Sequence, residues 1–252
     1  ELKSRGLGDV YKRQVVIVGG GVAGLTVALN LAPRKVCVIT KSSLGINTSS
    51  SWAQGGIAAA VSKDDSIESH INDTLTTAKG LANIDAIKEV VNNAKGIIDD
   101  LEGYGVNFDK NEDGTFNLGL EGAHSFNRII RSRGDSSGLE IMRGLIGRVK
   151  KSDHITVLEN VSIDRIMTEK NTIYGVIGRF TDDNIPDSNV IIQSSHVVLA
   201  TGGLGGIFAN TTNPRSSYGE GVALASHAGA TLTDMEFVPV SYTHLTLPTS
   251  QY

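Results

Sequence analysis

Hydrophobic residues in this chain alternate between short continuous runs and spaced helical patterns. Val15–Val18 is a continuous run of β-branched residues, and Val36–Ile39 is a second apolar run. Such runs are typical of strands buried on both faces of a parallel sheet. Between them, apolar residues recur at three- and four-residue spacing, which predicts a helix that Pro33 ends. The order strand, helix, strand predicts a βαβ unit and an α/β fold.

The middle of the chain has a helical pattern. Asp64 or Asp65 can cap one helix, whose apolar positions are Ile67, Ile71, Leu75 and Ala78. A second helix is predicted over residues 84–101, with Gly103 stopping it. Its predicted apolar face consists of Ile87, Val90, Val91, Ala94, Ile97, Ile98 and Leu101. A third helix opens at Asp135 or Ser136 and carries Ile141, Leu145 and Val149.

Strand patterns return over residues 155–192. Lys170 and Asn171 predict one turn between strands, and residues 182–184 predict another. Residues 197–200 form another apolar run, which ends at Thr201, and a last helix is predicted over 221–228. The fold prediction is therefore α/β: a Rossmann-like domain with a parallel sheet and inserted β-hairpin strands.

Composition narrows the class of protein. The 252 residues are 40% hydrophobic and 20% charged, which is ordinary for a globular protein in water. A net charge of -4 gives no support for nucleic-acid binding, and no apolar run approaches the roughly 20 residues that span a bilayer. The single cysteine, Cys37, excludes an intrachain disulfide and favours a reducing cytoplasm. We expect a buried thiol there, and no metal site.

The two ends differ from the rest in pattern. Residues 1–14 and 239–252 show no usable periodicity and back-translate well onto adaptor DNA used in transposase-based sequencing libraries. We therefore interpret both as non-native segments, with the alternative that they are natural tails of unusual sequence. The native domain would then span residues 15–238, truncated at its carboxyl end.

A glycine pattern follows the first strand directly. Gly19, Gly21 and Gly24 form a G-x-G-x-x-G segment between a predicted strand and a predicted helix. The first glycine permits a tight turn, the second lets a pyrophosphate approach the backbone, and the third lets helix and strand pack closely. The helix N-terminus offers free N–H groups to phosphates. This context favours dinucleotide binding over a purely structural glycine turn.

The end of the second strand departs from the usual NAD pattern. An acidic residue commonly stands there to hold ribose hydroxyls. Here the sequence reads Thr40-Lys41-Ser42, with a cation and hydroxyls in its place. This difference favours a flavoprotein, and it makes Lys41 a candidate FAD ligand.

Three other segments are candidates for contact with a flavin. In the first, small residues and paired glycines would let backbone amides approach a planar ring, with a flexible linker as the alternative: Ser49, Ser50, Ser51, Trp52, Ala53, Gln54, Gly55 and Gly56. In the second, Thr201, Gly202 and Gly203 end a strand. In the third, Glu220 precedes the last helix and could accept from a ribose or ribitol hydroxyl, unless it is a solvated surface residue.

A charged cluster lies in the middle of the chain. Glu121, His124 and Arg128 occur in the segment Glu-Gly-Ala-His-Ser-x-x-Arg, with Arg131 and Arg133 after it. Arginine binds carboxylates through two parallel hydrogen bonds, and glutamate can bind an ammonium group. The cluster suits a small dianionic substrate that carries an amino group. The alternative is that these are structural or solvated side chains.

In their order, these motifs resemble the flavoprotein family of L-aspartate oxidase, fumarate reductase and succinate dehydrogenase. The segments that carry the resemblance are GGGVAG, TKSS, SSSWAQGGIAAA, EGAHSFNRI, GDSSG, VVLATGG, TTNP and DMEFV. Within the family, the L-aspartate oxidase branch fits best, because Glu121 matches the glutamate taken to recognise the substrate α-amino group. Succinate and fumarate enzymes commonly attach FAD through a histidine five positions before the glutamine, where this chain has Ser49.

The resemblance implies non-covalent FAD and oxidation of L-aspartate to iminoaspartate, with oxygen or fumarate as acceptor, for quinolinate and NAD synthesis. It implies flavin contacts from Gly21, Val22, Ala23, Gly24, Lys41, residues 49–56 and Glu220, where the family usually has aspartate. Quinolinate synthase is an expected pathway partner. The family's capping domain, with its acid/base arginine, has no counterpart here. The alternatives are a fumarate reductase or succinate dehydrogenase flavoprotein, and a non-catalytic FAD-binding module.

Overall fold

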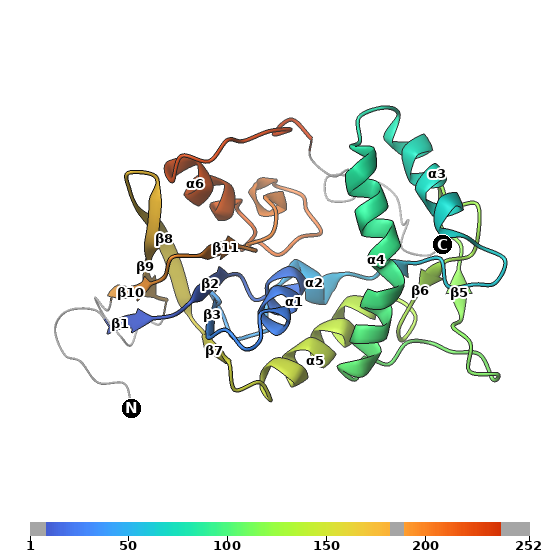
Figure 1. The fold of residues 1–252 in the computed structure, drawn as a ribbon, viewed down its shortest axis with the longest axis horizontal. Coiled ribbons are helices and arrows are strands. Elements are labelled where there is room, and N and C mark those ends of the chain that lie inside the picture. Colours follow the sequence, from blue (N-terminus) through green and yellow to red (C-terminus); the bar gives the residue numbers. More distant parts are fainter. Residues whose placement is uncertain (1–8, 182–188, 238–252) are drawn as a thin grey trace. The chain divides into compact units, whose positions relative to one another are not determined.

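The computed structural model describes residues 9–181 and 189–237 (Figure 1). The chain divides into two compact units, Glu1–Ser51 with Ile146–Tyr252 and Trp52–Leu145, called here the first and second units. The segments 1–8, 182–188 and 238–252 lie outside the described residues. They include the predicted turn at 182–184 and the whole of the tail at 239–252, so those predictions stay predictions.

A parallel sheet forms the centre of the first unit. Its strand order is β11 (Val197–Leu199), β2 (Val15–Val18), β3 (Val36–Ile39) and β7 (Ile155–Leu158), and every neighbouring pair is parallel. All residues of β2 and β3 are buried. This confirms the predicted α/β fold with a parallel sheet.

Helix α1 (Val22–Asn30) packs on this sheet between β2 and β3 in the chain (Figure 1). Its residues Leu25 and Ala28 are fully buried. The helix ends before the predicted stop at Pro33, and its spacing of apolar residues is the one that the sequence predicted. The predicted βαβ unit is therefore present.

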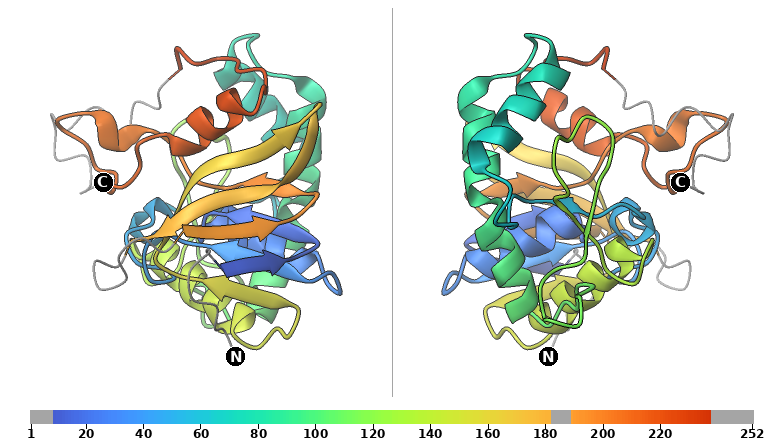
Figure 2. Two further views of the ribbon diagram at one scale, coloured as in Figure 1. Left: turned by 90° about the vertical axis from the view of Figure 1, so that its left-hand side faces the viewer. Right: turned by 90° about the vertical axis from the view of Figure 1, so that its right-hand side faces the viewer.

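A second sheet of the first unit has the order β1 (Asp9–Lys12), β10 (Asn189–Gln193), β9 (Thr172–Phe180) and β8 (Val161–Glu169). Figure 2 shows its long strands running beside the parallel strands. One hydrophobic cluster joins the two sheets, with Val16 and Ile39 from the parallel sheet and Val176 and Ile192 from the other. Burial of these side chains is the main stabilising contribution to this unit.

The inserted strands form the predicted hairpin. Strands β8 and β9 pair antiparallel, and the turn residues Lys170 and Asn171 have positive φ angles of 48° and 60°. Strand β1 pairs in parallel with β10, and it falls within the 1–14 segment that the sequence interpretation set aside. The remaining elements of this unit are η1 (Gly205–Ile207) and α6 (Glu220–His227), which begins one residue earlier than predicted.

The second unit contains two long helices and a small sheet. Helices α3 (Ile67–Ala78) and α4 (Ile84–Gly103) pack together, and β4 (Ile57–Ala58), β6 (Ile129–Ile130) and β5 (Leu118–Gly119) form an antiparallel sheet. Helix α5 (Ser137–Val149) and the short α2 (Ser49–Trp52) cross the boundaries between the units. The segment at 41–61, between β3 and α3, contains α2 and β4.

Two local predictions for the ends of the helices differ from the structure. Ser66, and not Asp64 or Asp65, caps α3 by accepting from the Ser69 backbone N–H at 3.0 Å. Gly103 is still helical, and the left-handed residue that follows α4 is Gly105, with φ +87°. A glycine takes this conformation without the clash that a Cβ would cause.

The apolar face of α4 is narrower than predicted. Ile87, Val91, Ala94, Ile98 and Leu101 are buried as expected. The remaining two, Val90 and Ile97, are 69% and 45% exposed. They lie on the flank of the stripe, where packing against the rest of the unit does not reach them. In the described part of the chain, no helix is long and apolar enough to cross a membrane.

Candidate functional site

The glycine segment after β2 has the geometry of a phosphate cradle. Gly19 has φ +122°, and a Cβ on it would stand 2.1 Å from the Ala200 carbonyl oxygen. A Cβ on Gly24 would stand 2.0 Å from the Gly19 carbonyl oxygen. Neither distance is possible for a side chain, so both positions require glycine. The structure thus agrees with the roles predicted for the first and third glycines, a tight turn and close helix packing.

The N-terminus of α1 faces this cradle with its backbone donors. Gly21 is the N-cap residue in an extended conformation, no side chain caps the helix, and its first turn contains no acidic residue. The Val22 N–H donates to Ser50 Oγ at 3.1 Å. Backbone N–H groups and the positive end of the helix dipole favour anions here. Ser50 therefore places the start of the 49–56 segment at the N-terminus of α1.

Lys41 and Glu220 come together although 179 residues separate them. The Lys41 ammonium forms an ion pair with the Glu220 carboxylate, and it lies 5.6 Å from the centre of the Tyr218 ring. Lys41 follows β3 and Glu220 begins α6, so the parallel sheet and α6 position the two side chains. The sequence analysis named these two residues separately as cofactor ligands, and in the first unit they form one ion pair.

Ser49 belongs to a small polar network. Its hydroxyl donates to Asn213 Oδ1 at 3.1 Å and lies 3.4 Å from Ser217 Oγ. Asn213 and Ser217 are both buried. The Thr-Asn-Pro segment is therefore joined to α2, a connection that sequence reasoning missed because it lies 164 residues away.

The segment after α2 lies in the second unit. Trp52 is 53% exposed, and the Ala53 carbonyl accepts from the Gly138 N–H at 2.9 Å. A Cβ on Gly56 would stand 2.3 Å from the Ile130 carbonyl oxygen, so Gly56 packs closely on β6, while Gly55 has nothing within 4 Å of that position. Gln54 and Gly55 are exposed. Residues 53–56 belong to no helix or strand, and the segment contacts the rest of the unit through the Ala53 carbonyl and through Gly56.

The strand β11 ends in a glycine-rich turn. Gly202 has φ +79°, and nothing lies within 4 Å of a Cβ position on Gly202 or Gly203. Thr201 packs on the start of α6, where a Cβ on Gly221 would stand 2.0 Å from Thr201 Oγ1. This turn leaves an uncovered backbone surface in the first unit.

Glu121 and His124 lie in the second unit, in the loop that joins β5 and β6. The Glu121 carboxylate accepts from Arg131 Nη2 at 2.8 Å, and these side chains are 45% and 40% exposed. The His124 N–H donates to the Glu121 carbonyl at 3.3 Å, and the His124 ring meets the His70 ring edge-on at 5.5 Å. The loop therefore presents a carboxylate and a guanidinium side by side at the surface of the unit.

Arg128 has a different environment from the one expected of a substrate ligand. Its side chain is fully buried, and its guanidinium binds Asp65 and Asp73. Sequence reasoning named Asp65 only as a possible helix cap, and it missed Asp73 and His70. All three lie 50 or more residues before Arg128 in the chain, so no local pattern connects them.

The environment shifts several pKa values. Two hydrogen bonds from Ser125, followed by the charge of Arg128, lower the pKa of Asp73. Burial, followed by the charges of Arg128 and His124, lowers the pKa of His70. Burial raises the pKa of Cys37 to about 12, so this thiol stays protonated and unreactive at neutral pH.

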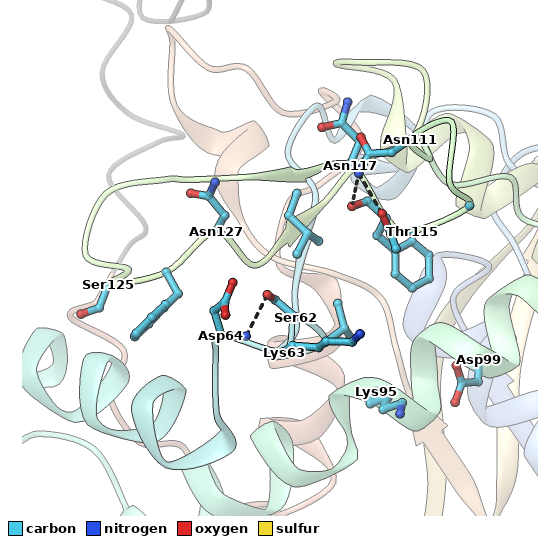
Figure 3. Close-up of a pocket in the computed structure, with 15 residues that line it drawn as sticks. Ser62, Lys63, Asp64, Lys95, Asp99, Asn111, Thr115, Asn117, Ser125 and Asn127 are labelled. Carbon is cyan, nitrogen blue, oxygen red and sulfur yellow. Dashed lines mark hydrogen bonds between the residues drawn. The ribbon is translucent and has the colours of Figure 1, made fainter.

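A hollow of about 940 Å³ lies within the second unit (Figure 3). Its lining includes Lys63 and Lys95 but also Asp64 and Asp99, so both charges are present. None of the candidate ligands Glu121, His124 and Arg128 lines it. Its size does not by itself make it the functional site.

The first unit fits a dinucleotide in its donor groups. The cradle offers the α1 amides without a competing carboxylate, and Lys41 and Glu220 supply a cation and an acceptor at the end of β3. The uncovered backbone at Gly202 and Gly203 suits a flat ligand that approaches closely. These features fit an FAD site.

Curated relatives match most of the length of this chain. L-aspartate oxidase from Agrobacterium fabrum is 45% identical over 233 residues, which are 92% of this chain and 44% of that protein. L-aspartate oxidase from Bacillus subtilis is 38% identical over 227 residues, 90% of this chain and 41% of that protein. The chain thus spans less than half the length of these curated relatives.

Solved structures show the same fold. A Mycobacterium smegmatis Sdh1 complex in the apo form has a TM-score of 0.81 at 31% identity, over 87% of this chain and 39% of that one. A flavocytochrome c3 fumarate reductase in its open conformation has a TM-score of 0.79 at 25% identity, over 91% of this chain and 42% of that one.

The model of the FAD binding domain family matches residues 14–251, which is nearly the whole sequence. It includes the cradle, Lys41, the 49–56 segment and Glu220. The chain therefore belongs to the FAD-binding domain family, and FAD is its cofactor.

Proposed function

We propose that this chain is the FAD-binding part of an L-aspartate oxidase. The proposed reaction oxidises L-aspartate to iminoaspartate, with oxygen or fumarate as the electron acceptor, and supplies quinolinate synthesis on the route to NAD. The observation that carries the proposal is the loop at 121–125, which presents Glu121 beside Arg131 in a chain whose relatives are named L-aspartate oxidase. Quinolinate synthase as a partner and a cytoplasmic location belong to the same proposal.

The chemistry of the substrate explains the loop. Oxidation of an amino acid removes a hydride from the α-carbon and a proton from the amino nitrogen, and a C=N bond forms. FAD, when bound, would supply the acceptor for the hydride. The Glu121 carboxylate would bind the α-ammonium group, and its exposed position leaves it accessible to a ligand. His124 lies in the same turn and would border this site.

The first unit would hold the cofactor without a covalent bond. The α1 amides at Val22, Ala23 and Gly24 would bind the pyrophosphate, and Lys41 and Glu220 would bind near the ribose or ribitol hydroxyls. Ser49 donates to Asn213 and stands where covalent flavoproteins of the family have a histidine. A serine hydroxyl at this position supports reversible binding of FAD.

Two other functions remain as alternatives. The likeness to succinate dehydrogenase and fumarate reductase structures favours a flavoprotein subunit of that kind. Succinate and fumarate carry no ammonium group, so Glu121 would have no such group to bind in that enzyme. The third candidate is a non-catalytic module that binds FAD only.

The test uses the complete product of the gene that encodes this chain. We expect L-aspartate to drive peroxide formation, and we expect Glu121→Gln to raise the KM for L-aspartate about tenfold or more, because a charged hydrogen bond contributes roughly 1.5–3 kcal/mol. Glu112→Gln, at an exposed glutamate in the same unit, is the matched control.

Three results would decide between the candidates. Oxidation of succinate without oxidation of L-aspartate would favour the dehydrogenase alternative. Binding of FAD without oxidation of either substrate would favour the module. A flavin that stays attached after denaturation, seen by mass spectrometry, would contradict the proposed non-covalent site.

A further inference from the structure

Arg128 lies at the centre of a buried network in the second unit. Its Nε donates to Asp65 Oδ2 at 2.9 Å and its Nη2 donates to Asp65 Oδ1 at 2.8 Å, a paired geometry. Its Nη1 lies 2.9 Å from Asp73 Oδ2. The side chains of Arg128 and Asp65 are both 0% exposed. The buried Arg128 cation is thus paired with two carboxylates. Asp65 lies just before α3, and Asp73 lies within it.

The guanidinium of Arg128 has partners for all of its donors. Nη2 also donates to Ser69 Oγ at 3.2 Å, and Nη1 also faces His124 Nδ1 at 3.5 Å. A guanidinium has five N–H groups, and these contacts account for each of them. A substrate carboxylate could bind Arg128 only by displacing Asp65 or Asp73, which would leave a buried charge without its partner.

Asp73 carries this network to the loop at 121–125. Its Oδ2 accepts from the Ser125 backbone N–H at 2.8 Å, and its Oδ1 accepts from the Ser125 hydroxyl at 2.6 Å. The Asp73 carboxylate therefore binds both the Arg128 guanidinium and Ser125 of the loop. The residue before Ser125, His124, donates its backbone N–H to the Glu121 carbonyl. The tip of the loop is thus joined to α3.

The base of the same loop is fixed separately. Gly119 pairs with Ile129 in the antiparallel sheet, and the Arg128 N–H donates to the Gly119 carbonyl at 3.1 Å. Arg128 thus closes the base of the loop with its backbone and reaches the tip through Asp73 with its side chain. A loop held at both ends presents Glu121 in one orientation, which lowers the entropy lost when a ligand binds.

We propose that Arg128, Asp65 and Asp73 form a positioning clamp that holds the loop at 121–125 on α3, and that Arg128 does not bind the substrate itself. We call these three residues the Arg128 clamp. The inference rests on the proposed function, because the loop matters to catalysis only if Glu121 binds the substrate. It changes the role of Arg128 from a substrate ligand to a positioning residue.

The clamp and direct binding predict opposite effects of one substitution. Asp73→Asn keeps the shape of the side chain but removes the charge that binds Arg128 and weakens the bonds to Ser125. If Arg128 were a substrate ligand, loss of a competing carboxylate would free it and lower the KM for L-aspartate. If it is a clamp, the loop loosens and the KM rises, by about tenfold for a lost charged hydrogen bond.

The test measures Asp73→Asn and Ser125→Ala, with Asp64→Asn as the matched control at an exposed neighbouring carboxylate. Hydrogen exchange of the peptide that contains Ser125 is followed in the chain with FAD, and the KM is measured on the complete gene product. We expect exchange about tenfold faster in Asp73→Asn, a smaller increase in Ser125→Ala, and no change in Asp64→Asn. Ser125 is exposed, so its variant tests the clamp even if Asp73→Asn fails to fold.

Unchanged exchange in both variants overturns the clamp, and so does a lower KM in Asp73→Asn. The exchange measurement needs no catalysis. If the wild-type gene product does not oxidise L-aspartate, the proposed function fails, while the exchange result still decides whether the loop is held by Asp73. Faster exchange together with a raised KM and an unchanged flavin absorption spectrum supports both.

Discussion

The phosphate cradle and the Arg128 clamp are built on opposite principles. The cradle brings backbone close to backbone at Gly19 and Gly24, and its N-cap residue Gly21 gives the α1 donors no side-chain cap, while the Val22 N–H donates to Ser50 Oγ. The clamp gives every donor of Arg128 a partner and excludes water from the pair with Asp65. Groups that bind a ligand must keep binding capacity in reserve, whereas groups that position others are saturated within the protein. Saturation combined with complete burial therefore separates the Arg128–Asp65 pair from exposed pairs such as Lys41–Glu220, which a ligand can reach.

The largest effect is expected from Gly24→Val. Its Cβ would stand 2.0 Å from the Gly19 carbonyl oxygen, and backbone cannot move aside as a flexible side chain can. We expect the variant to lose cooperative unfolding and to retain no FAD after gel filtration. The control is Gly147→Ala in α5, where a Cβ meets nothing within 4 Å and should stabilise the helix by about 0.5–1 kcal/mol. Normal FAD retention in Gly24→Val would show that the cradle does not depend on this close contact.

The next largest effect is expected from Asp65→Ala. Removing one partner of a buried ion pair leaves an uncompensated charge, which costs about 3–5 kcal/mol in the free energy of unfolding. The control is Asp164→Ala, because the Asp164–Arg179 pair is 38% and 64% exposed and should contribute about 0–1 kcal/mol. Urea unfolding measures both. Equal losses in the two variants would mean that burial does not distinguish the clamp from a surface ion pair.

A smaller, pH-dependent effect is expected at Glu140 in α5. Hydrogen bonds from Arg143, followed by bonds from Asn107, lower the pKa of Glu140 to about 2. Because the folded-state value lies below the ordinary value of 4.5, the stabilisation is complete above pH 4.5 and is lost as the pH falls toward 2. Glu140→Gln should therefore flatten the decline of unfolding free energy between pH 4.5 and pH 2. An unchanged slope in urea melts across that range would contradict this assignment.

The smallest effect is expected from Glu220→Gln in the protein without FAD. The Lys41–Glu220 pair is 42% and 32% exposed, so its contribution to the free energy of unfolding should be about 0–1 kcal/mol. Because Glu220 is a proposed FAD ligand, we expect this substitution to change the affinity for FAD more than the free energy of unfolding. Fluorescence titration with FAD and urea melts separate the two quantities. A loss of stability as large as that of Asp65→Ala would place Glu220 with the saturated, structural groups.

The cradle could be predicted from the sequence because its requirements are local. Gly19, Gly21 and Gly24 lie within six residues, and the strand and helix on either side follow from their own apolar patterns. A glycine that needs a positive φ or a close backbone contact leaves a trace in the sequence, since other residues cannot replace it. Strands β2 and β3 and helix α1 were therefore placed correctly.

The roles of charged residues could not be predicted in the same way. Arg128 looked like a carboxylate ligand because arginine binds carboxylates, and it does bind two, but both belong to the protein. Asp65 and Asp73 lie 63 and 55 positions away, so their pairing with Arg128 leaves no local pattern. The exposure of Val90 and Ile97 could not be predicted either. Only the arrangement of neighbouring elements decides which flank of an apolar stripe is covered.

The sequence by itself determined the α/β fold, the FAD family, the glycine cradle and the identity of the residues that carry charge near it. The tertiary structure alone decided that Lys41 meets Glu220, that Ser49 meets Asn213, and that Arg128 is saturated by Asp65 and Asp73. The physical reason is range. Backbone conformation and helical period act over a few residues, whereas the partner of a charge is set by the fold as a whole.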